Sequence, residues 1–429
     1  MPFGFAGKAQ KLQIILVAGA ETRDERGVAF ETMTGQPDLP RWCETVFGLL
    51  RRIETGSISF TLPDGRTFVA KGRQPGPEGH FDIRNPQLFT RLVREGDLGF
   101  AEAYLDRWWE TPDLQALMDV ALLNNDQIGY SFPGSGLVRA YERVRHWLRA
   151  NTRSGAKRNI AYHYDLGNEF YRLWLDPSMT YSSALYSGQG ETLEQAQRNK
   201  YASICDRMRL KPGDHVLEIG CGWGGFAEYA IREHGARVTG LTLSREQYEF
   251  AQRRLFEAGL ADRAEIILRD YREETGSYDG IASIEMFEAV GERYWPAYFR
   301  TVFERLRPGR AASIQMITIA ENLFERYRWS TDFIQKYIFP GGMLAAPSVA
   351  LRCAEAAGLV HAGSVEFGES YSRTLREWYR SFNEHWDEMA QLGFDDRFRR
   401  MWNLYLTGCA ACFAAGTTDV TQIALRRPA

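Results

Sequence analysis

The sequence predicts an α/β protein in which a doubly wound, mostly parallel sheet follows a smaller α+β domain. Two observations support this prediction. Short apolar segments alternate with amphipathic segments from Lys211 onward, as they do where each parallel strand is followed by a helical crossover. The length of 429 residues also exceeds that of one ordinary domain, which takes roughly 150 residues.

Changes of composition divide the chain into four segments. The first carries turn-forming residues without sustained periodicity and is expected to be a poorly ordered leader. A small α+β domain follows, then a linker with a basic helix, and then the α/β domain. These segments are 1–40, 41–130, 131–158 and 159–429.

Each expected element has a local reason in the sequence. Alternating apolar residues on both sides of Pro63-Asp64-Gly65 predict a hairpin. The hairpin strands are expected at 57–62 and 67–70, and helices of the same domain at 86–94, 100–109 and 112–123. In the α/β domain, short apolar runs predict buried strands, and apolar residues at helical spacing predict helices. The strands are expected at 215–219, 237–242, 264–268, 278–284 and 311–319, and the helices at 226–233, 245–258 and 296–306.

The composition narrows the class of protein. With 52 basic and 55 acidic side chains, the chain lacks the positive field of a nucleic-acid-binding protein, and no nucleic-acid partner is expected. No apolar run approaches the roughly 20 residues of a membrane-spanning helix. The six cysteines are scattered and no export signal precedes them, which favours reduced thiols in the cytoplasm. Cys409 and Cys412 lack a second pair or clustered histidines, so no metal site is expected.

A basic segment interrupts this balanced charge. Residues 139–158 hold seven basic side chains and one acid, Glu142, with apolar residues at helical spacing. This pattern allows two interpretations: a helix that binds an anionic membrane surface, or a solvated linker helix that packs on the next domain.

A glycine-rich turn follows the first strand of the α/β domain. Its glycines, Gly220, Gly222 and Gly224, run as G-x-G-x-G-G rather than as the G-x-G-x-x-G of dinucleotide enzymes. Glu218, just before the turn, would repel a pyrophosphate but could hold the amine of a cationic sulfonium cofactor. The pattern resembles the first motif of class I S-adenosylmethionine methyltransferases, which implies that cofactor and a Rossmann-like sheet.

The rest of the expected cofactor site is unusual. Where most such enzymes end the second strand with an acid that binds the ribose, this chain has Thr242, Leu243 and, further on, Gln247 as neutral partners. After the third strand, Asp270 and Tyr271 are expected to bind and flank the adenine.

Six motifs extend the similarity over most of the chain. In order, they are His163-Tyr-Asp-Leu-Gly-Asn168, Met179-Thr-Tyr-Ser-Ser-Ala184, Leu217-Glu-Ile-Gly-Cys-Gly-Trp-Gly224, Leu241-Thr-Leu-Ser-Arg-Glu-Gln247, Met286-Phe-Glu-Ala-Val-Gly291 and Tyr337-Ile-Phe-Pro-Gly-Gly342. From about residue 159 to 427, and more weakly from about residue 48, the chain resembles the cyclopropane-fatty-acyl-phospholipid synthases and mycolic acid methyltransferases. The resemblance implies that the substrate is the cis double bond of an acyl chain in a membrane phospholipid. It adds Tyr181 and Ser182 to the expected cofactor site.

The implied partner is the surface of a phospholipid bilayer, and the implied location is the cytoplasm, with peripheral association to the inner membrane surface. The N-terminal domain would then contact lipid or form a homodimer.

The implied chemistry is methyl transfer to an isolated alkene, which leaves a carbocation on the acyl chain. Aromatic faces can stabilise such a cation and exclude water. The expected pocket residues, which could equally be core packing residues, are Tyr164, Phe170, Trp329, Phe333, Tyr337 and Phe339.

The resemblance also implies a bicarbonate ion that removes the final proton. Its binding residues would include Glu288, Tyr371 and the backbone of Ile317. Two positions depart from the family pattern: Ser183 stands where the family has cysteine, and Gln315 where it has histidine. Glutamine cannot take up a proton as histidine can, so the bicarbonate site is weakened, reshaped or lost. Glu285 precedes Glu288 by three residues, and the alternation of a strand would turn it to the other face.

The departures favour one product over another. Loss of a proton from the new methyl carbon closes a cyclopropane, whereas loss from a neighbouring chain carbon leaves a methylated or methylene-bearing chain without a ring. We favour the ring-free product and retain the cyclopropane as the alternative. An inactive lipid-binding scaffold and an enzyme for a small soluble acceptor are further alternatives.

Overall fold

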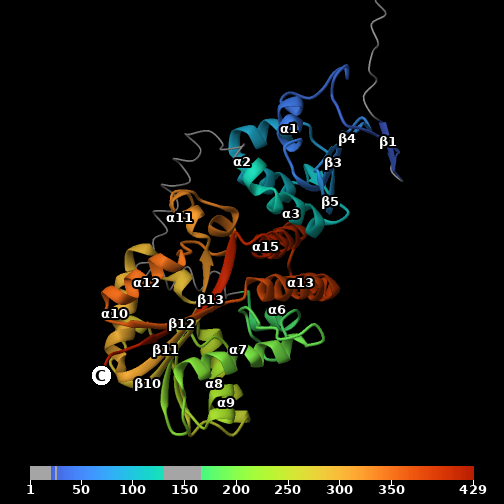
Figure 1. Ribbon diagram of the computed structural model, residues 1–429. Helices are drawn as coiled ribbons and strands as arrows, with labels where there is room; N and C mark the ends of the chain where they lie inside the picture. The colour runs from blue at the N-terminus through green and yellow to red at the C-terminus, as the bar shows by residue number, and fades with distance from the viewer. Residues whose placement is uncertain (1–20, 25–26, 130–165) are drawn as a thin grey trace, which may run out of the picture.

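The structure is a computed structural model of the chain and describes residues 21–24, 27–129 and 166–429 (Figure 1). Its larger sheet has seven strands in the order β12-β13-β11-β10-β7-β8-β9. The strand bounds are β7 His215–Ile219, β8 Arg237–Thr242, β9 Ala264–Leu268, β10 Tyr278–Ile284, β11 Leu306–Ile319, β12 Val360–Glu366 and β13 Thr418–Arg426. The strands from β7 to β11 are parallel to one another, and β13 runs antiparallel to both β11 and β12.

The predicted mostly parallel, Rossmann-like sheet is therefore confirmed. The chain leaves β7 toward β8 and β9 on one side and returns to β10 and β11 on the other. This change of direction between β7 and β10 is the place where open α/β sheets bind ligands, outside the carboxyl ends of their strands.

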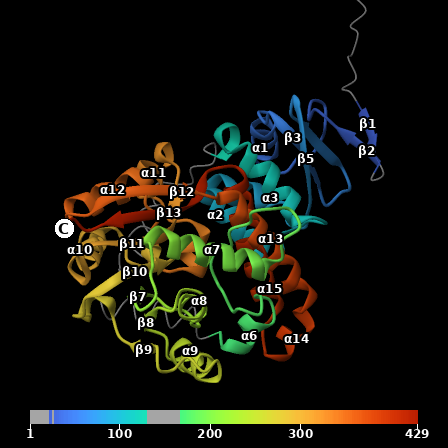
Figure 2. The same cartoon turned by 60° about the horizontal axis from the view of Figure 1, so that its bottom comes forward.

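Helices cover both faces of this sheet. On one face, α7 (Leu193–Met208), α8 (Gly225–His234) and α9 (Arg245–Glu257) bury Val216 and Val238. On the other face, α10 (Trp295–Arg305) and α12 (Pro347–Ala356) bury Leu217 and Leu241. Successive strand residues thus enter different cores, as the alternation of side chains along a strand requires. The layers can be followed in Figure 2.

A third, aromatic core lies under the remaining helices of the α/β domain. It is built from α6, α13, α14 and α15 together with the loop around Tyr181. The bounds of these helices and of α11 are α6 Asn168–Arg172, α11 Glu321–Tyr327, α13 Gly368–Glu384, α14 Trp386–Gln391 and α15 Asp396–Ala414. Among its rings, Trp174 lies 5.4 Å from Trp378, and Tyr181 lies 5.3 Å from Trp378, between ring centroids. Ring contacts at these spacings add to the stability that comes from apolar burial.

The N-terminal domain contains a second sheet, with the order β1-β2-β4-β3-β5-β6. Its elements are β1 Glu21–Asp24, β2 Gly27–Phe30, α1 Cys43–Leu50, β3 Thr55–Thr61, β4 Thr67–Lys71, β5 Gln74–Ile83, α2 Leu88–Leu105, β6 Trp109–Glu110 and α3 Leu114–Leu123. The predicted hairpin is confirmed as β3 and β4. The two helices expected at 86–94 and 100–109 are one helix, α2, with a kink at Gly96, whose φ is 66°.

The expectation of a poorly ordered leader is wrong for part of that segment. Strand β2 pairs with β4 through Ala29 and Phe30, and Met33 is buried in the core of the domain. The hydrogen bonds between β2 and β4 are made by backbone groups, and this short segment has no alternation of apolar and polar side chains that would predict a strand. Residues 131–158, including the basic segment 139–158, lie outside the described residues.

Within the described part of the chain, no helix is long and apolar enough to cross a bilayer. Helix α15 instead packs against α2 and α3 and so joins the two domains. Arg400 of α15 is only 8% exposed. Its guanidinium donates to the carbonyls of Tyr104 and Trp109 and to the carboxylate of Glu110, and it lies 3.8 Å from the centre of the Tyr104 ring.

We expect Arg400→Met to destabilise the protein, because it removes the buried guanidinium that binds Glu110 and the carbonyls of Tyr104 and Trp109. The loss in the free energy of unfolding should be about 2 kcal/mol, because polar groups that lose a hydrogen-bond donor in a buried site cost about 1–3 kcal/mol. Arg397→Met is the matched control on the same helix, since Arg397 pairs with Asp106 at the surface and such pairs contribute less than about 1 kcal/mol. Urea denaturation measures both, and equal effects of the two substitutions would contradict the assignment.

Candidate active site

The glycine-rich turn joins β7 to α8 and faces two different surroundings. Gly220 has a φ of 84°, and a Cβ there would come within 2.9 Å of the Met286 side chain. Gly222 has a φ of 51°, and a Cβ there would meet nothing within 4 Å. Only glycine combines left-handed backbone with such close approach. The turn therefore packs against the segment after β10 and leaves open space beside Gly222.

Glu218 lies beneath this turn on β7 and is 2% exposed. No described residue hydrogen-bonds to its Oε2 atom. Burial raises the pKa of this carboxyl well above its usual value, against the attraction of Lys200 and Arg254. A buried carboxylate oxygen without a partner is costly, and a ligand's ammonium group would remove that cost. The amino-acid part of S-adenosylmethionine carries such a group, so the site fits this cofactor.

Neutral side chains occupy the end of β8, as the sequence predicts. Thr242 Oγ1 donates to Gln247 Oε1 over 2.9 Å, and both residues are 5% exposed. Leu243 between them is partly buried. The Ser244 hydroxyl caps α9 by accepting from the backbone N–H of Gln247. The pair could therefore meet the ribose hydroxyls without bringing a further buried charge.

Asp270 and Tyr271 follow β9, where an adenine is expected. The Asp270 carboxylate accepts from the Arg272 side chain at 2.8 Å and 2.5 Å. Tyr271 is partly buried, with its ring 5.6 Å from that of Tyr298. The structure thus places both residues at the carboxyl edge of the sheet, with the acid already held by an arginine.

Residues 181–183 pass along the opposite side of the site. The Tyr181 hydroxyl lies 2.8 Å from the Tyr405 hydroxyl. Ser182 Oγ accepts from the Lys200 ammonium over 2.7 Å. The backbone N–H of Ser183 donates to Glu285 Oε1 over 2.7 Å. This segment therefore connects the aromatic core to the charged groups of the site.

Two glutamates lie close together after β10. Glu285 Oε1 also accepts from Gln315 Nε2 over 2.7 Å, and the nearby Tyr371 side chain favours the ionised form of the same carboxyl group and so lowers its pKa, against the larger effect of burial. Glu288 Oε1 accepts from the backbone N–H of Ile317. Burial and the charge of Glu285 raise the pKa of Glu288 to about 8.

Glu285 and Glu288 are partly buried residues, and burial is the main cause of the raised pKa values of their carboxyl groups. The Glu288 Oε2 atom is itself buried. Their neighbours Ser183 and Gln315 are fully buried, and Tyr371 is 5% exposed. The two glutamates therefore belong to a largely buried cluster of polar groups.

The structure brings the four predicted catalytic residues together, namely Glu288, Tyr371, Gln315 and Ser183. It differs from the sequence-based expectation for Glu285, which joins them instead of facing away. Strand β10 ends at Ile284, and Glu285 has a φ of 49°. The alternation of strand side chains therefore stops one residue before Glu285.

Lys200, which is fully buried on α7, is a further residue of the site that the sequence pattern did not predict. Burial lowers the pKa of its ammonium, against the attraction of Glu285, Asp176 and Glu218. Lys200 lies four residues from both Ala196 and Ile204, which are buried on the same helix. A lysine in the apolar stripe of a helix was the available signal.

The expected aromatic pocket residues are dispersed. Tyr164 lies outside the described residues. Phe170 has no accessible surface and packs on Phe394 and Trp402. Trp329 is 58% exposed, so its assignment to an enclosed lining is wrong.

The other three candidates lie on the segment after α11. Phe333 and Tyr337 pack between the two domains, where the Tyr337 hydroxyl donates to Glu102 over 2.8 Å. Phe339 lies 6.5 Å from the Tyr181 ring and 6.1 Å from the Tyr405 ring. Phe339 is therefore the candidate that the structure places beside the site.

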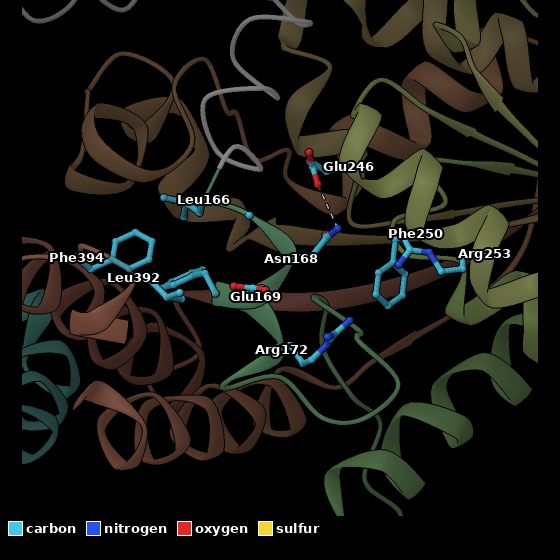
Figure 3. A pocket seen from close by; sticks show the side chains of 11 residues that line it. Leu166, Asn168, Glu169, Arg172, Glu246, Phe250, Arg253, Leu392 and Phe394 are labelled. Atoms are coloured by element: carbon cyan, nitrogen blue, oxygen red, sulfur yellow. Dashed lines mark hydrogen bonds between the residues drawn. The ribbon is translucent and has the colours of Figure 1, made fainter. Parts of the chain in front are cut away.

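A cleft of about 490 Å³ opens between α6, α9 and the loop that follows α14. Figure 3 shows Asn168 between its two walls, with its amide donating to Glu246 over 3.2 Å. Asn168 Oδ1 also accepts from Trp223 Nε1 over 2.6 Å. Three sequence motifs thus meet at Asn168, but neither Glu285 nor Glu288 lines this cleft.

Comparisons with known proteins agree with this geometry. The sequence profile of the mycolic acid cyclopropane synthetase family matches residues 151–423. Tuberculostearic acid methyltransferase UfaA1 from Mycobacterium tuberculosis is 37% identical over 402 residues, covering 88% of this chain and 90% of that protein. Cyclopropane-fatty-acyl-phospholipid synthase from Escherichia coli is 35% identical over 354 residues, covering 80% and 87%.

A solved structure shares the fold of the α/β domain. The mycolic acid cyclopropane synthase CmaA1 in complex with SAH and CTAB matches with a TM-score of 0.60 and 29% identity, over 63% of this chain and 98% of that one. SAH is what S-adenosylmethionine becomes when it gives up its methyl group. The expected cofactor, S-adenosylmethionine, is thereby confirmed.

We expect Glu218→Gln to weaken S-adenosylmethionine binding by about ten- to hundredfold, because a charged hydrogen bond contributes about 1.5–3 kcal/mol. Since the pKa of Glu218 is raised in the free protein, a bound ammonium should expel a proton. The affinity of the unsubstituted protein should then increase with pH, and the substitution should flatten that dependence.

Calorimetric titration at several pH values measures both effects. Glu233→Gln is the matched control, because Glu233 pairs with Arg198 at the surface. Unchanged affinity in Glu218→Gln would show that this carboxylate does not hold the cofactor.

Proposed function

The chain belongs to the mycolic acid cyclopropane synthetase family of S-adenosylmethionine-dependent enzymes, and on that premise we propose the reaction that it catalyses. It methylates the cis double bond of an unsaturated acyl chain in a membrane phospholipid and releases a product without a ring. Residues 159–429 carry out the reaction, and the N-terminal domain contacts lipid or a second copy of the chain.

One observation supports the proposal most directly. Met286 touches the cofactor turn at Gly220, and Glu285 and Glu288 flank Met286 on the same short segment. The groups that can accept a proton therefore lie beside the place from which the methyl group comes. A methylation that ends with loss of a proton from carbon needs both groups within reach of one substrate.

When bound, S-adenosylmethionine supplies an electrophilic methyl group. The side chains around it would have separate tasks: Glu218 would hold the ammonium end, and Thr242 and Gln247 would bind the ribose. The aromatic core beside Tyr181 excludes water. An isolated alkene is a weak nucleophile, so its orientation in a dry site carries much of the rate.

The aromatic faces have a second task. The methylated acyl chain carries a positive charge, which the rings of Tyr181 and Phe339 would stabilise through their negative faces. Water at this point would add to the cation and form an alcohol. The hydroxyls of Tyr181 and Tyr405 are joined by a hydrogen bond. This hydrogen bond reduces the reactivity of the two hydroxyls toward the cation.

The ring-free product is favoured over the cyclopropane for two reasons. Gln315 and Ser183 replace the histidine and cysteine that the family pattern has at these positions. The relative with 37% identity is named for tuberculostearic acid, whereas the relative with 35% identity is named for a cyclopropane product. An inactive scaffold is disfavoured, because the glycine-rich turn and the polar side chains expected at the site, Glu218, Thr242, Gln247 and Glu288, are all retained. A small acceptor would not need so apolar a core.

We expect cells that express the protein to accumulate acyl chains that are heavier by one CH2 group and still unsaturated. The ring-free product and the cyclopropane have the same mass, so gas chromatography with mass spectrometry should be run before and after mild hydrogenation. The ring-free chain takes up hydrogen and becomes methyl-branched, whereas a cyclopropane resists. A product that survives hydrogenation unchanged would contradict the ring-free assignment.

The proposed location is the cytoplasmic face of the inner membrane, with the basic residues 139–158 binding anionic lipid. These residues lie outside the described structure, and the proposal rests on their charge and spacing in the sequence. Reversing the charge of Arg145, Arg149 and Arg153 should weaken sedimentation with anionic vesicles, most strongly at low salt. Sedimentation equal to that of the unsubstituted protein would remove the membrane role from this segment.

A further inference from the structure

The two neighbouring glutamates of the site have different surroundings. We propose that Glu285 is the base that takes the proton from the methylated acyl chain, and that Glu288 stays protonated beside it. The inference rests on the proposed function, because it concerns the second half of that reaction. It assigns the proton acceptor to a side chain of the protein instead of a bound bicarbonate ion.

Two donors hydrogen-bond to Glu285, and Tyr371 lies near it. The donors are the backbone N–H of Ser183 and the side-chain amide of Gln315, and the nearby Tyr371 side chain favours the ionised carboxylate. The family resemblance places these same three residues around a bicarbonate ion. In the structure they are engaged by a carboxylate of the chain, which has the same charge and a similar planar shape. Donors that already bind one anion do not hold a second.

The orientation of the Gln315 amide is fixed by its own neighbour. Gln315 Oε1 accepts from Gln422 Nε2 over 2.9 Å, and Gln422 Oε1 accepts from Ser203 Oγ over 2.6 Å. The Gln315 amide must therefore present its N–H to Glu285. The result is a chain of donors that begins at Ser203 and ends at this carboxylate. Glutamine keeps that direction at every pH, since it does not titrate.

A buried cation completes the environment of Glu285. The Lys200 ammonium attracts its charge and so opposes the effect of burial on its pKa. Lys200 is held by Ser182, the residue before the donor Ser183. Glu285 therefore has two hydrogen-bond donors, the nearby Tyr371 and a cation that stabilise its ionised form.

Glu288 has much less support for a negative charge. Among the described residues, only one hydrogen bond reaches its carboxyl group, from the backbone N–H of Ile317 to Oε1, and the Oε2 atom has no partner there. The charge of Glu285 also repels it. Two close carboxylates in a buried site share one proton, and these contacts place the proton on Glu288.

The proton transfer is balanced as follows. A C–H bond breaks on a carbon bonded to the cationic carbon of the acyl chain, and its electron pair forms the new C=C bond. The proton goes to the Glu285 carboxylate, which becomes neutral. Water removes the proton after the product leaves, and no other reactant is needed.

The test uses purified full-length protein, S-adenosylmethionine and vesicles of dioleoylphosphatidylglycerol and dioleoylphosphatidylethanolamine, in buffer freed of carbon dioxide. We expect the unsubstituted protein to be equally active with and without added bicarbonate. Glu285→Gln keeps the shape but cannot accept a proton, and product formation should fall about hundredfold or more. Glu288→Gln resembles the protonated carboxyl, so its activity should fall by less than about tenfold. In the unsubstituted protein, activity should decline as the pH rises through the pKa of Glu288, about 8, because Glu288 then loses its proton. This decline should be absent in Glu288→Gln.

Two controls separate loss of the base from loss of the fold. Glu249→Gln changes an exposed carboxylate on α9 and should match the unsubstituted protein. Glu285→Gly removes the carboxylate and frees its two donors, so added bicarbonate or formate should restore part of the activity. Such rescue requires a folded site that lacks only its base.

Several results would overturn the inference. They are a requirement of the unsubstituted protein for bicarbonate, an active Glu285→Gln variant, or a larger loss in Glu288→Gln than in Glu285→Gln. If the unsubstituted protein is active and one of these results appears, the inference fails while the proposed function stands. If the unsubstituted protein forms no lipid product at all, the proposed function fails and the inference fails with it.

Discussion

The balance of charge in a water-poor interior is the constraint on which the site depends. Lys200, Glu218, Glu285 and Glu288 all lie where burial dominates their pKa values. One cation cannot compensate three anions in such surroundings. The charges balance if Glu285 is ionised near Lys200, Glu288 is protonated, and Glu218 binds the ammonium group of the cofactor. The bound cofactor is then part of the electrostatic balance of the folded protein as well as its methyl source.

Strand β13, which runs antiparallel to both of its neighbours, supports this balance of charge. In the pairing of β11 with β13, Gln315 lies directly opposite Gln422, so the ladder itself sets the amide chain that ends at Glu285. Strand β13 follows α15, whose other contacts join the N-terminal domain. Cross-strand neighbours interact strongly in antiparallel pairs. Strand β13 therefore connects the position of the second domain to the hydrogen bonds of the site.

The sequence predicted the parts of this structure that local patterns control. The observed bounds of β7, β8, β9 and β10 equal the predicted ones, because buried parallel strands appear as short apolar runs between turn residues. Strands β12 and β13 were missed, since their pairing depends on contacts between distant segments. Glu285 was placed on the wrong face because its left-handed φ ends the alternation, and Lys200 was overlooked because its partners come from other elements. Glu285 and Lys200 both lie at the functional site, where local sequence rules are most often broken.

The departures from the family pattern have a common explanation in Glu285. Ser183 contributes its backbone N–H, while its hydroxyl turns to the carbonyl of Ala184, so a serine in place of cysteine removes no donor from the anion. Gln315 likewise donates through its amide and needs no proton of its own. A histidine at this position could donate or accept according to its tautomer, which suits a site whose anion comes and goes. A glutamine suits a permanent carboxylate. The three residues are therefore consistent with one another as a single built-in anion site, although each departs from expectation when it is considered alone.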